Sequence, residues 1–125
     1  MGTRLIRRYS FAAAHKLACG AAHQCARLHG HTYDVAVTVH RVSHDVDRGP
    51  GWVIDITELD KCWDRIRGLY DHHLLNESLG EDSPTCEILA RRLYEHWARE
   101  LQALRIVVMR VEVSESPRMT AIYDG

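Results

Sequence analysis

Alternation of apolar and polar residues predicts four β-strands, because side chains two positions apart on a strand point to the same face. The alternating segments are residues 4–15, 31–42, 105–115 and 120–124. The apolar face of the first carries Tyr9, Phe11, Ala13 and His15. The apolar face of the third carries Val107, Met109, Val111, Val113 and Glu115. We therefore expect each strand to turn one face toward a common core.

Helical spacing of apolar residues predicts two helices between the second and third strands. The first covers residues 57–69, where one face carries Leu59, Cys62, Trp63, Ile66 and Leu69. The second begins at Ser83 and Pro84, an N-cap followed by a first-turn proline, and runs to Gln102. Residues 47–51 are predicted as a turn and residues 71–76 as an irregular segment.

The order of these elements, β-β-α-α-β-β, predicts an α+β fold in which two helices cover a four-stranded antiparallel sheet. A chain of 125 residues without an internal linker is predicted to be a single domain, residues 1–125. A net charge of -1 gives no reason to expect nucleic acid or an anionic membrane as the partner. No apolar run approaches the roughly 20 residues that span a bilayer, and no secretion signal opens the chain. The predicted location is cytoplasmic.

The segment Cys25-Ala26-Arg27-Leu28-His29-Gly30-His31 indicates a metal site. In a strand, His29 and His31 present both imidazoles on one face. His15 becomes their neighbour if the first two strands form a hairpin, and three imidazoles with an open fourth position favour catalytic Zn²⁺. Cys19 and His23 compete for the third position. The alternative is a closed structural zinc site of Cys19, Cys25, His29 and His31.

Three further groups suggest acid–base chemistry and ligand binding. Asp71-His72 places a carboxylate beside an imidazole, the pair that orients a general acid–base histidine, although a solvent-exposed loop histidine fits the dipeptide as well. Cys25 could be a reactive thiolate beside the metal. Glu115 is the polar exception on an apolar strand face. It is either a strand-end charge or a carboxylate that accepts two N–H bonds from an amino-pyrimidine edge.

Six segments together resemble the 6-pyruvoyltetrahydropterin synthase/QueD family, and within it the bacterial 6-carboxytetrahydropterin synthases. They run in family order over nearly the whole chain: Phe11-Ala12-Ala13-Ala14-His15, Cys25-Ala26-Arg27-Leu28-His29-Gly30-His31, Gly51-Trp52-Val53-Ile54-Asp55, Asp71-His72-His73-Leu74-Leu75-Asn76, Pro84-Thr85-Cys86-Glu87 and Val111-Glu112-Val113-Ser114-Glu115. The four-residue step from Cys25 to His29 is more similar to the carboxy-forming branch than to the pyruvoyl branch. Cys86 departs from the Ser or Thr that is usual in the family.

This resemblance implies the tunnelling fold (T-fold), a homohexamer of two stacked trimers, and active sites at subunit interfaces. It implies zinc on His15, His29 and His31, and a catalytic Cys25 with Asp71 and His72 as its acid–base partners. It also implies that Glu115 holds a pterin ring, in a pocket lined by Thr85 and Cys86.

The implied activity is that of a carbon–carbon lyase of the queuosine or 7-deazapurine precursor pathway. It converts 7,8-dihydroneopterin triphosphate to 6-carboxy-5,6,7,8-tetrahydropterin, acetaldehyde and triphosphate. One alternative is the 6-pyruvoyltetrahydropterin synthase reaction, which eliminates triphosphate without cutting the side chain. The other is a zinc-dependent pterin-binding protein that does not turn over its ligand.

Overall fold

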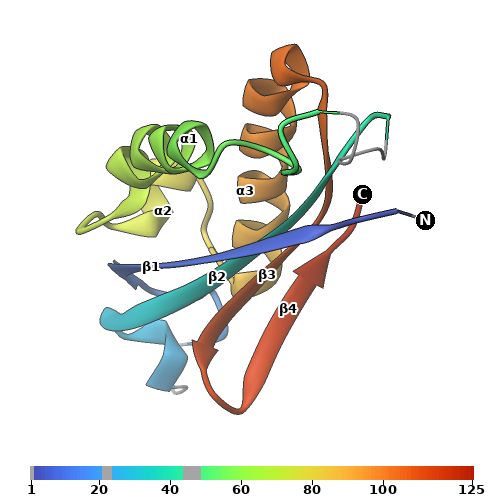
Figure 1. Ribbon diagram of the computed structural model, residues 1–125. Helices are drawn as coiled ribbons and strands as arrows, with labels where there is room; N and C mark the ends of the chain where they lie inside the picture. Colours follow the sequence, from blue (N-terminus) through green and yellow to red (C-terminus); the bar gives the residue numbers. More distant parts are fainter. Residues whose placement is uncertain (1, 21–23, 44–48) are drawn as a thin grey trace.

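A computed structural model describes residues 2–20, 24–43 and 49–125 of the chain. Its four strands form one antiparallel sheet in the order β1-β2-β3-β4, so each strand pairs with its neighbours along the chain (Figure 1). The strands are β1 (Leu5–His15), β2 (His29–Arg41), β3 (Ile106–Ser116) and β4 (Met119–Tyr123). All four predicted strands are confirmed, with β2 beginning two residues earlier than expected. Part of the predicted turn at 47–51, and His23, lie outside the described residues.

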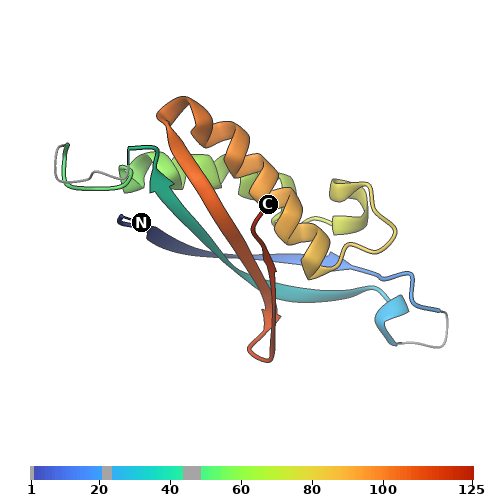
Figure 2. The same ribbon diagram turned by 90° about the vertical axis from the view of Figure 1, so that its right-hand side faces the viewer.

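Helices cover one face of this sheet, as Figure 2 shows from the side. They are α1 (Ile56–Tyr70), α2 (Leu75–Leu79) and α3 (Cys86–Leu101). The predicted α+β architecture with two long helices on one face is confirmed. The short α2 is an addition, inside a region where only an irregular segment was expected. None of the helices in the described part of the chain is long and apolar enough to cross a membrane.

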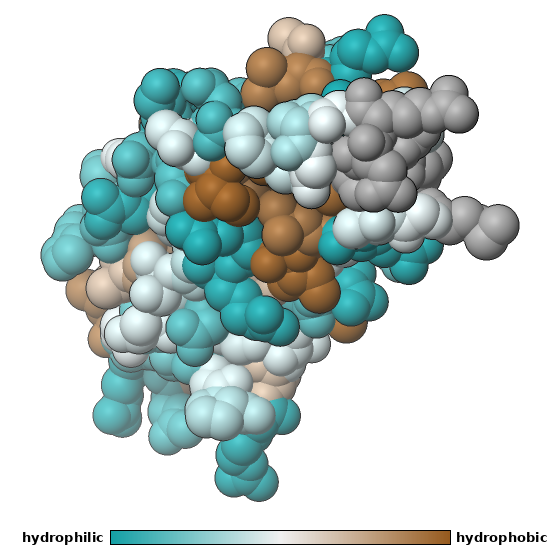
Figure 3. Space-filling view, in the orientation of Figure 1, coloured by the Kyte–Doolittle hydropathy of each residue, from teal (hydrophilic) through white to brown (hydrophobic). Residues whose placement is uncertain are grey.

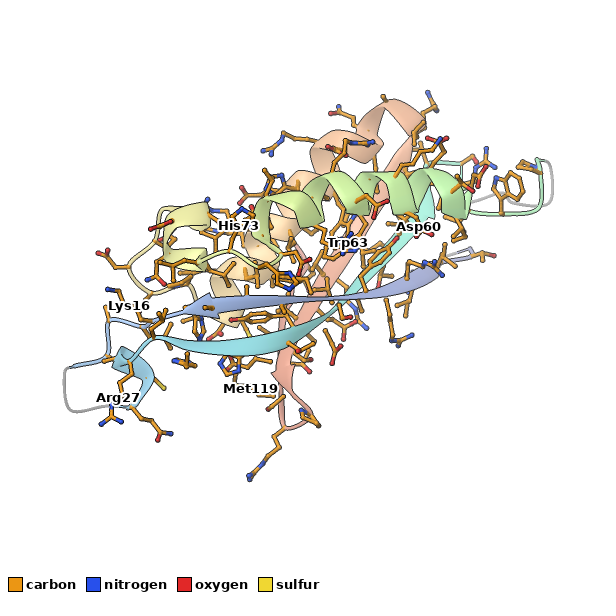
Figure 4. All side chains as sticks on the ribbon, turned by 90° about the vertical axis from the view of Figure 1, so that its left-hand side faces the viewer. Lys16, Arg27, Asp60, Trp63, His73 and Met119 are labelled. Atoms are coloured by element: carbon orange, nitrogen blue, oxygen red, sulfur yellow. The ribbon has the colours of Figure 1, made fainter. Side chains whose placement is uncertain are left out.

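Helix α1 is attached to β1 by an aromatic and a charged contact. The ring of Trp63, which Figure 4 shows between α1 and the sheet, stacks on Tyr9 with centroids 4.8 Å apart. Asp60 accepts a hydrogen bond from the Tyr9 hydroxyl at 2.7 Å and two from the Arg7 guanidinium. One predicted core position of α1 is wrong: Leu69 is half-exposed, and Tyr70 is buried instead. The Tyr70 hydroxyl lies 2.6 Å from Nε2 of His96, so α3 holds Tyr70 inside.

The predicted N-cap of α3 is displaced by two residues. Thr85 is the cap, and its side chain accepts a hydrogen bond from the Ile88 N–H at 3.3 Å. The Ser83 hydroxyl instead accepts from the Ala18 N–H at 2.7 Å. Ser83 therefore fixes the loop that follows β1, while Thr85 begins the helix.

A β-bulge in β3 changes which side chains reach the core. Thr38 pairs with Arg110 but Val39 pairs with Val108, so Met109 is an extra residue on β3. An extra residue shifts the alternation by one position. Val108 is consequently buried and Val107 is exposed, and the predicted placement of Val107 on the core face is wrong.

Among the described residues, no helix packs on the sheet face opposite α1 and α3 (Figure 2). Figure 3 shows hydrophilic side chains over much of the side seen in Figure 1, interrupted by an apolar patch. Strand residues with large exposed apolar side chains are Ile6, Val107, Met119 and Ile122. Exposed apolar groups on an open sheet face are typical of a surface that packs against another molecule.

Candidate active site

The pairing of β1 with β2 brings three histidines together at one end of the sheet. His15 lies opposite His29, and Ala13 lies opposite His31. One ring nitrogen from each of His15, His29 and His31 lies within 4.8 Å of the other two, which makes the group a candidate metal site. The predicted grouping of these three imidazoles is therefore present in the structure.

Backbone carbonyls determine which nitrogen of two of these histidines carries the proton. His15 Nδ1 lies 3.0 Å from the Pro84 oxygen, and His29 Nδ1 lies 2.7 Å from the Arg27 oxygen. A carbonyl oxygen only accepts, so both Nδ1 atoms donate, and in a neutral ring this leaves the lone pair on Nε2. Burial, together with the neighbouring His29 and His31, lowers the pKa of His15, which favours this neutral form.

The two Nε2 atoms of His15 and His29 lie 3.0 Å apart. Two lone pairs at this distance repel each other unless a proton or a cation lies between them. In a tetrahedral zinc site with Zn–N bonds of 2.0–2.1 Å, two ligand nitrogens are about 3.3 Å apart. The observed geometry therefore fits a transition metal that imidazole ligands prefer, with a small outward adjustment.

The carbonyls of Pro84 and Arg27 are site components that sequence reasoning missed. They hold the ligand rings as hydrogen-bonded outer groups do in metal sites. No residue-type signal could have revealed them, because every residue carries a backbone carbonyl. The hydroxyl of the fully buried Tyr33 is a third group beside these rings, 3.2 Å from His15 Nδ1.

A cavity of about 440 Å³ opens beside the three histidines. Its walls include Cys25, Arg27 and Glu115 in addition to the imidazoles. Within the described residues, the grouped ligand atoms come from histidines, whereas Cys19 and Cys25 are not members of the group. The alternative of a closed site built from Cys19, Cys25, His29 and His31 is therefore not the arrangement found.

Glu115 enters this cavity at a second β-bulge. Ser114 pairs with Thr120 and Ser116 pairs with Met119, so Glu115 is the extra residue of β3. Bulges beside functional sites often redirect a side chain. The Glu115 carboxylate lies 3.4 Å from His31 Nε2, which adds negative charge next to the imidazoles.

Thr85 and Cys86 lie at the beginning of α3, with Cys86 near Glu115, but neither is among the residues that line the cavity. Cys86 is buried; burial and the nearby Glu115 raise the pKa of its thiol to about 12. The thiol is therefore protonated and interacts with the Glu115 carboxylate. A direct contact of Thr85 or Cys86 with a ligand stays a prediction.

Asp71 and His72 lie along the outer edge of β1. The His72 N–H donates to the Ala12 oxygen at 2.6 Å, and the Asp71 carboxylate accepts from the Ala12 N–H at 3.0 Å. His72 adopts a φ of 59°, and its Nδ1 lies 3.1 Å from Asp71 Oδ1. The Ala12 N–H, together with His72, lowers the pKa of Asp71, so the carboxylate is ionised and orients the imidazole. The predicted contact between the two adjacent side chains is present.

Within the described chain, however, Cys25 and His72 do not share a cavity. His72 lines a second cavity of about 570 Å³, and His31 lines both cavities. Figure 4 shows the neighbouring His73 and the loop residue Arg27 on opposite sides of the β1–β2 pair. The His72 side chain is 81% exposed. Cys25 and His72 therefore line different cavities of one subunit, on either side of His31.

A four-stranded antiparallel sheet covered by helices, with three histidines at its end, is the T-fold arrangement with a candidate metal centre. Residues 4–125 match the protein family described as 6-pyruvoyl tetrahydropterin synthase. The chain belongs to this family.

Similar proteins include both branches of the family. The 6-carboxy-5,6,7,8-tetrahydropterin synthase of Bacillus subtilis is 33% identical over 119 residues, covering 89% of this chain and 77% of that protein. The corresponding enzyme of Synechocystis is 34% identical over 72% of this chain and 70% of its own. The solved 6-pyruvoyl tetrahydropterin synthase of Caenorhabditis elegans superposes with a TM-score of 0.86 at 25% identity, covering 98% and 95% of the two chains. The prediction of an enzyme of this family is confirmed.

Proposed function

We propose that the protein is a zinc-dependent 6-carboxy-5,6,7,8-tetrahydropterin synthase. Its substrate would be 7,8-dihydroneopterin triphosphate, and its products 6-carboxytetrahydropterin, acetaldehyde and triphosphate. The observation that supports this most directly is the shared cavity of Cys25, Glu115 and the three histidines. Relatives at 33% and 34% identity carry the name of this activity.

His15, His29 and His31 would hold the zinc ion. Their carbonyl-bound rings leave Nε2 of His15 and His29 free to coordinate. Zinc bound there supplies Lewis acidity toward the hydroxyl groups of the substrate side chain. Three protein ligands leave a position for the substrate, as catalytic zinc sites require.

The remaining side chains would transfer protons and position the substrate. Cys25 would remove a proton from the substrate side chain, since its sulfur lies in the same cavity as the histidines. His72, oriented by the ionised Asp71, would return the proton. Glu115 would accept two N–H bonds from the amino-pyrimidine edge of the pterin, which fixes the reacting carbons beside Cys25.

We further propose that a neighbouring subunit completes the site, in a homohexamer of two stacked trimers. The placement of His72 supports this, because its imidazole is 81% exposed and lines a different cavity from Cys25, which leaves it available to the histidine cavity of a second copy. The uncovered sheet face with its exposed apolar residues supplies a surface for such packing. Residues 1–125 would form a single domain of this family in the cytoplasm. The product would be a precursor of queuosine or of another 7-deazapurine.

Mass spectrometry of the products tests the activity. Zinc-loaded protein is incubated with 7,8-dihydroneopterin triphosphate, with the Cys25→Ala variant as the matched control. A 6-carboxytetrahydropterin mass together with acetaldehyde, absent from the variant, would support the proposal. A pyruvoyl product would instead identify the 6-pyruvoyltetrahydropterin synthase reaction. Unchanged substrate that binds the protein would favour the non-catalytic pterin-binding alternative.

A further inference from the structure

The loop after β1 brings a second cysteine, Cys19, next to Cys25. The Leu17 N–H donates to the Cys25 carbonyl at 2.9 Å, and the Cys19 thiol donates to the Leu17 carbonyl at 3.6 Å. Both cysteines are thus held by the same backbone residue. Neither cysteine takes part in a disulfide among the described residues.

Contacts to the helical layer hold this loop in place. The Lys16 N–H donates to Asn76 Oδ1 at 3.0 Å, and the Asn76 amide donates back to the Lys16 carbonyl at 2.9 Å. The Ala18 N–H donates to the Ser83 hydroxyl at 2.7 Å. These hydrogen bonds fix the backbone immediately before Cys19, so the position of Cys19 relative to Cys25 is set by the fold.

The two thiols also interact with each other. Desolvation by nearby protein atoms raises the pKa of the Cys19 thiol, and the charge and hydrogen bonding of the Cys25 side chain raise it further. This agrees with the shared hydrogen bonds to Leu17, which hold both cysteines in one loop. Cys19 is exposed and Cys25 is half-buried, so small oxidants in solvent reach the pair.

The other two cysteines provide an internal contrast. Cys62 and Cys86 are buried, and burial raises the pKa of each thiol to about 12. Oxidation of cysteine follows thiolate character and exposure. We expect an oxidant to leave Cys62 and Cys86 unchanged and to reach the pair at the cavity first.

We propose that Cys19 and Cys25 form a reversible disulfide when the protein meets a peroxide, which makes this pair a redox modification site beside the histidine cavity that Cys25 lines. The formation of the disulfide follows from the placement of the two cysteines alone. Its consequence for turnover rests on the proposed role of Cys25.

The chemistry balances in two steps. The Cys25 thiolate attacks one oxygen of hydrogen peroxide, the S–O bond forms as the O–O bond breaks, and the released hydroxide takes up a proton as water. The Cys19 sulfur then attacks the Cys25 sulfenic acid, and the S–S bond forms as the second water leaves with the Cys19 proton. Two thiols are oxidised by two electrons in total, and one peroxide is reduced to two waters.

A sulfur in a disulfide cannot accept a proton from the substrate, so the oxidised protein would be inactive until a thiol reduces it. Cys19 would also protect Cys25, because a sulfenic acid captured as a disulfide escapes irreversible oxidation to sulfinic acid. Removal of Cys19 should convert a reversible inactivation into an irreversible one.

The test treats reduced, zinc-loaded wild-type protein and the Cys19→Ser variant with hydrogen peroxide. Intact mass, counting of free thiols and peptide mapping follow, before and after addition of dithiothreitol. In the wild type we expect the loss of two hydrogen atoms, a fall from four free thiols to two, and a linked peptide pair containing Cys19 and Cys25. Cys19→Ser should instead gain two oxygen atoms on Cys25 that dithiothreitol does not remove.

Absence of the Cys19–Cys25 peptide pair, or a linkage of Cys25 to another cysteine, would overturn the proposal. Turnover measured on the same samples addresses the role of Cys25 separately. A mapped disulfide with full turnover would confirm the modification site and overturn the assignment of Cys25 as a catalytic group. A lost turnover that dithiothreitol restores, with the disulfide mapped, would support both.

Discussion

Asp71→Asn isolates the charge that orients His72, because asparagine keeps the shape of the side chain. Asp71 Oδ1 accepts from the Ala12 N–H at 3.0 Å and lies 3.1 Å from His72 Nδ1, while Oδ2 lies 3.5 Å from the Arg67 guanidinium. An amide oxygen can still accept from Ala12. It no longer presents a negative charge to the His72 imidazole, and the amide nitrogen that replaces Oδ2 repels Arg67.

The structure predicts a small effect on stability and a large one on turnover. The His72 side chain is 81% exposed in the subunit, so its ion pair with Asp71 contributes at most about 1 kcal/mol. Weakening the charge-assisted bond from Ala12 costs about 1 kcal/mol more. For a chain of this size, each lost kcal/mol lowers Tm by roughly 4 °C. Loss of general acid–base assistance lowers kcat by roughly 10²–10⁴-fold.

The assay combines kcat and KM of zinc-loaded protein with urea unfolding and elemental analysis of zinc. We expect kcat to fall with KM and zinc content unchanged. Asp64→Asn, which changes an exposed carboxylate of α1, is the matched control and should keep wild-type turnover. A folded, zinc-loaded Asp71→Asn protein with turnover within a few-fold of wild type would refute the role of Asp71 in orienting His72.

Three further predictions concern the metal, the ligand and pH. His15→Ala should reduce zinc content to background in elemental analysis, whereas His40→Ala should keep it; full occupancy in His15→Ala would exclude His15 as a ligand. Glu115→Gln should raise the substrate Kd about tenfold or more, because a hydrogen bond to a charged group contributes roughly 1.5–3 kcal/mol, and zinc should be retained. An unchanged Kd would mean that the carboxylate is only a strand-end charge. Burial, followed by the positive charge of Arg99, lowers the pKa of His96. The unfolded chain therefore binds a proton that the folded chain does not, and the free energy of unfolding should fall as pH drops below about 6.5. Urea titrations should show a weaker fall in His96→Gln, and parallel curves for the two proteins would contradict this assignment.

Local pattern was sufficient to predict most of the fold. Alternation over residues 4–15 and 31–42 marked β1 and β2, and helical spacing marked the long helices. The two-residue spacing predicted that His29 and His31 share one strand face, and a hairpin of the first two strands would bring His15 beside them. These features depend on neighbours within a few residues, which is the range over which side-chain periodicity follows from backbone geometry. Elements of this kind can therefore be predicted from the sequence alone.

The exceptions arise where distant segments meet. The bulges at Met109 and Glu115 depend on how β3 pairs with both neighbours, and alternation alone misplaced Val107 as a result. Serine is a favourable N-cap residue, but the Ser83 hydroxyl accepts a hydrogen bond from the distant Ala18 N–H. Thr85 caps the helix instead. Local propensity cannot weigh such competing partners.

The sequence by itself determined which groups could do chemistry: three imidazoles, a thiol, and an adjacent carboxylate and imidazole. The tertiary structure decided which of them meet. It joined Cys25 and Glu115 to the histidines in one cavity and placed His72 in another. The reason is that residues 71–74 dock against the free edge of β1 through backbone hydrogen bonds to Ala12 and Ala14. Nearly every residue offers the same backbone donor and acceptor, so the side-chain pattern does not predict where a segment held by backbone hydrogen bonds will lie.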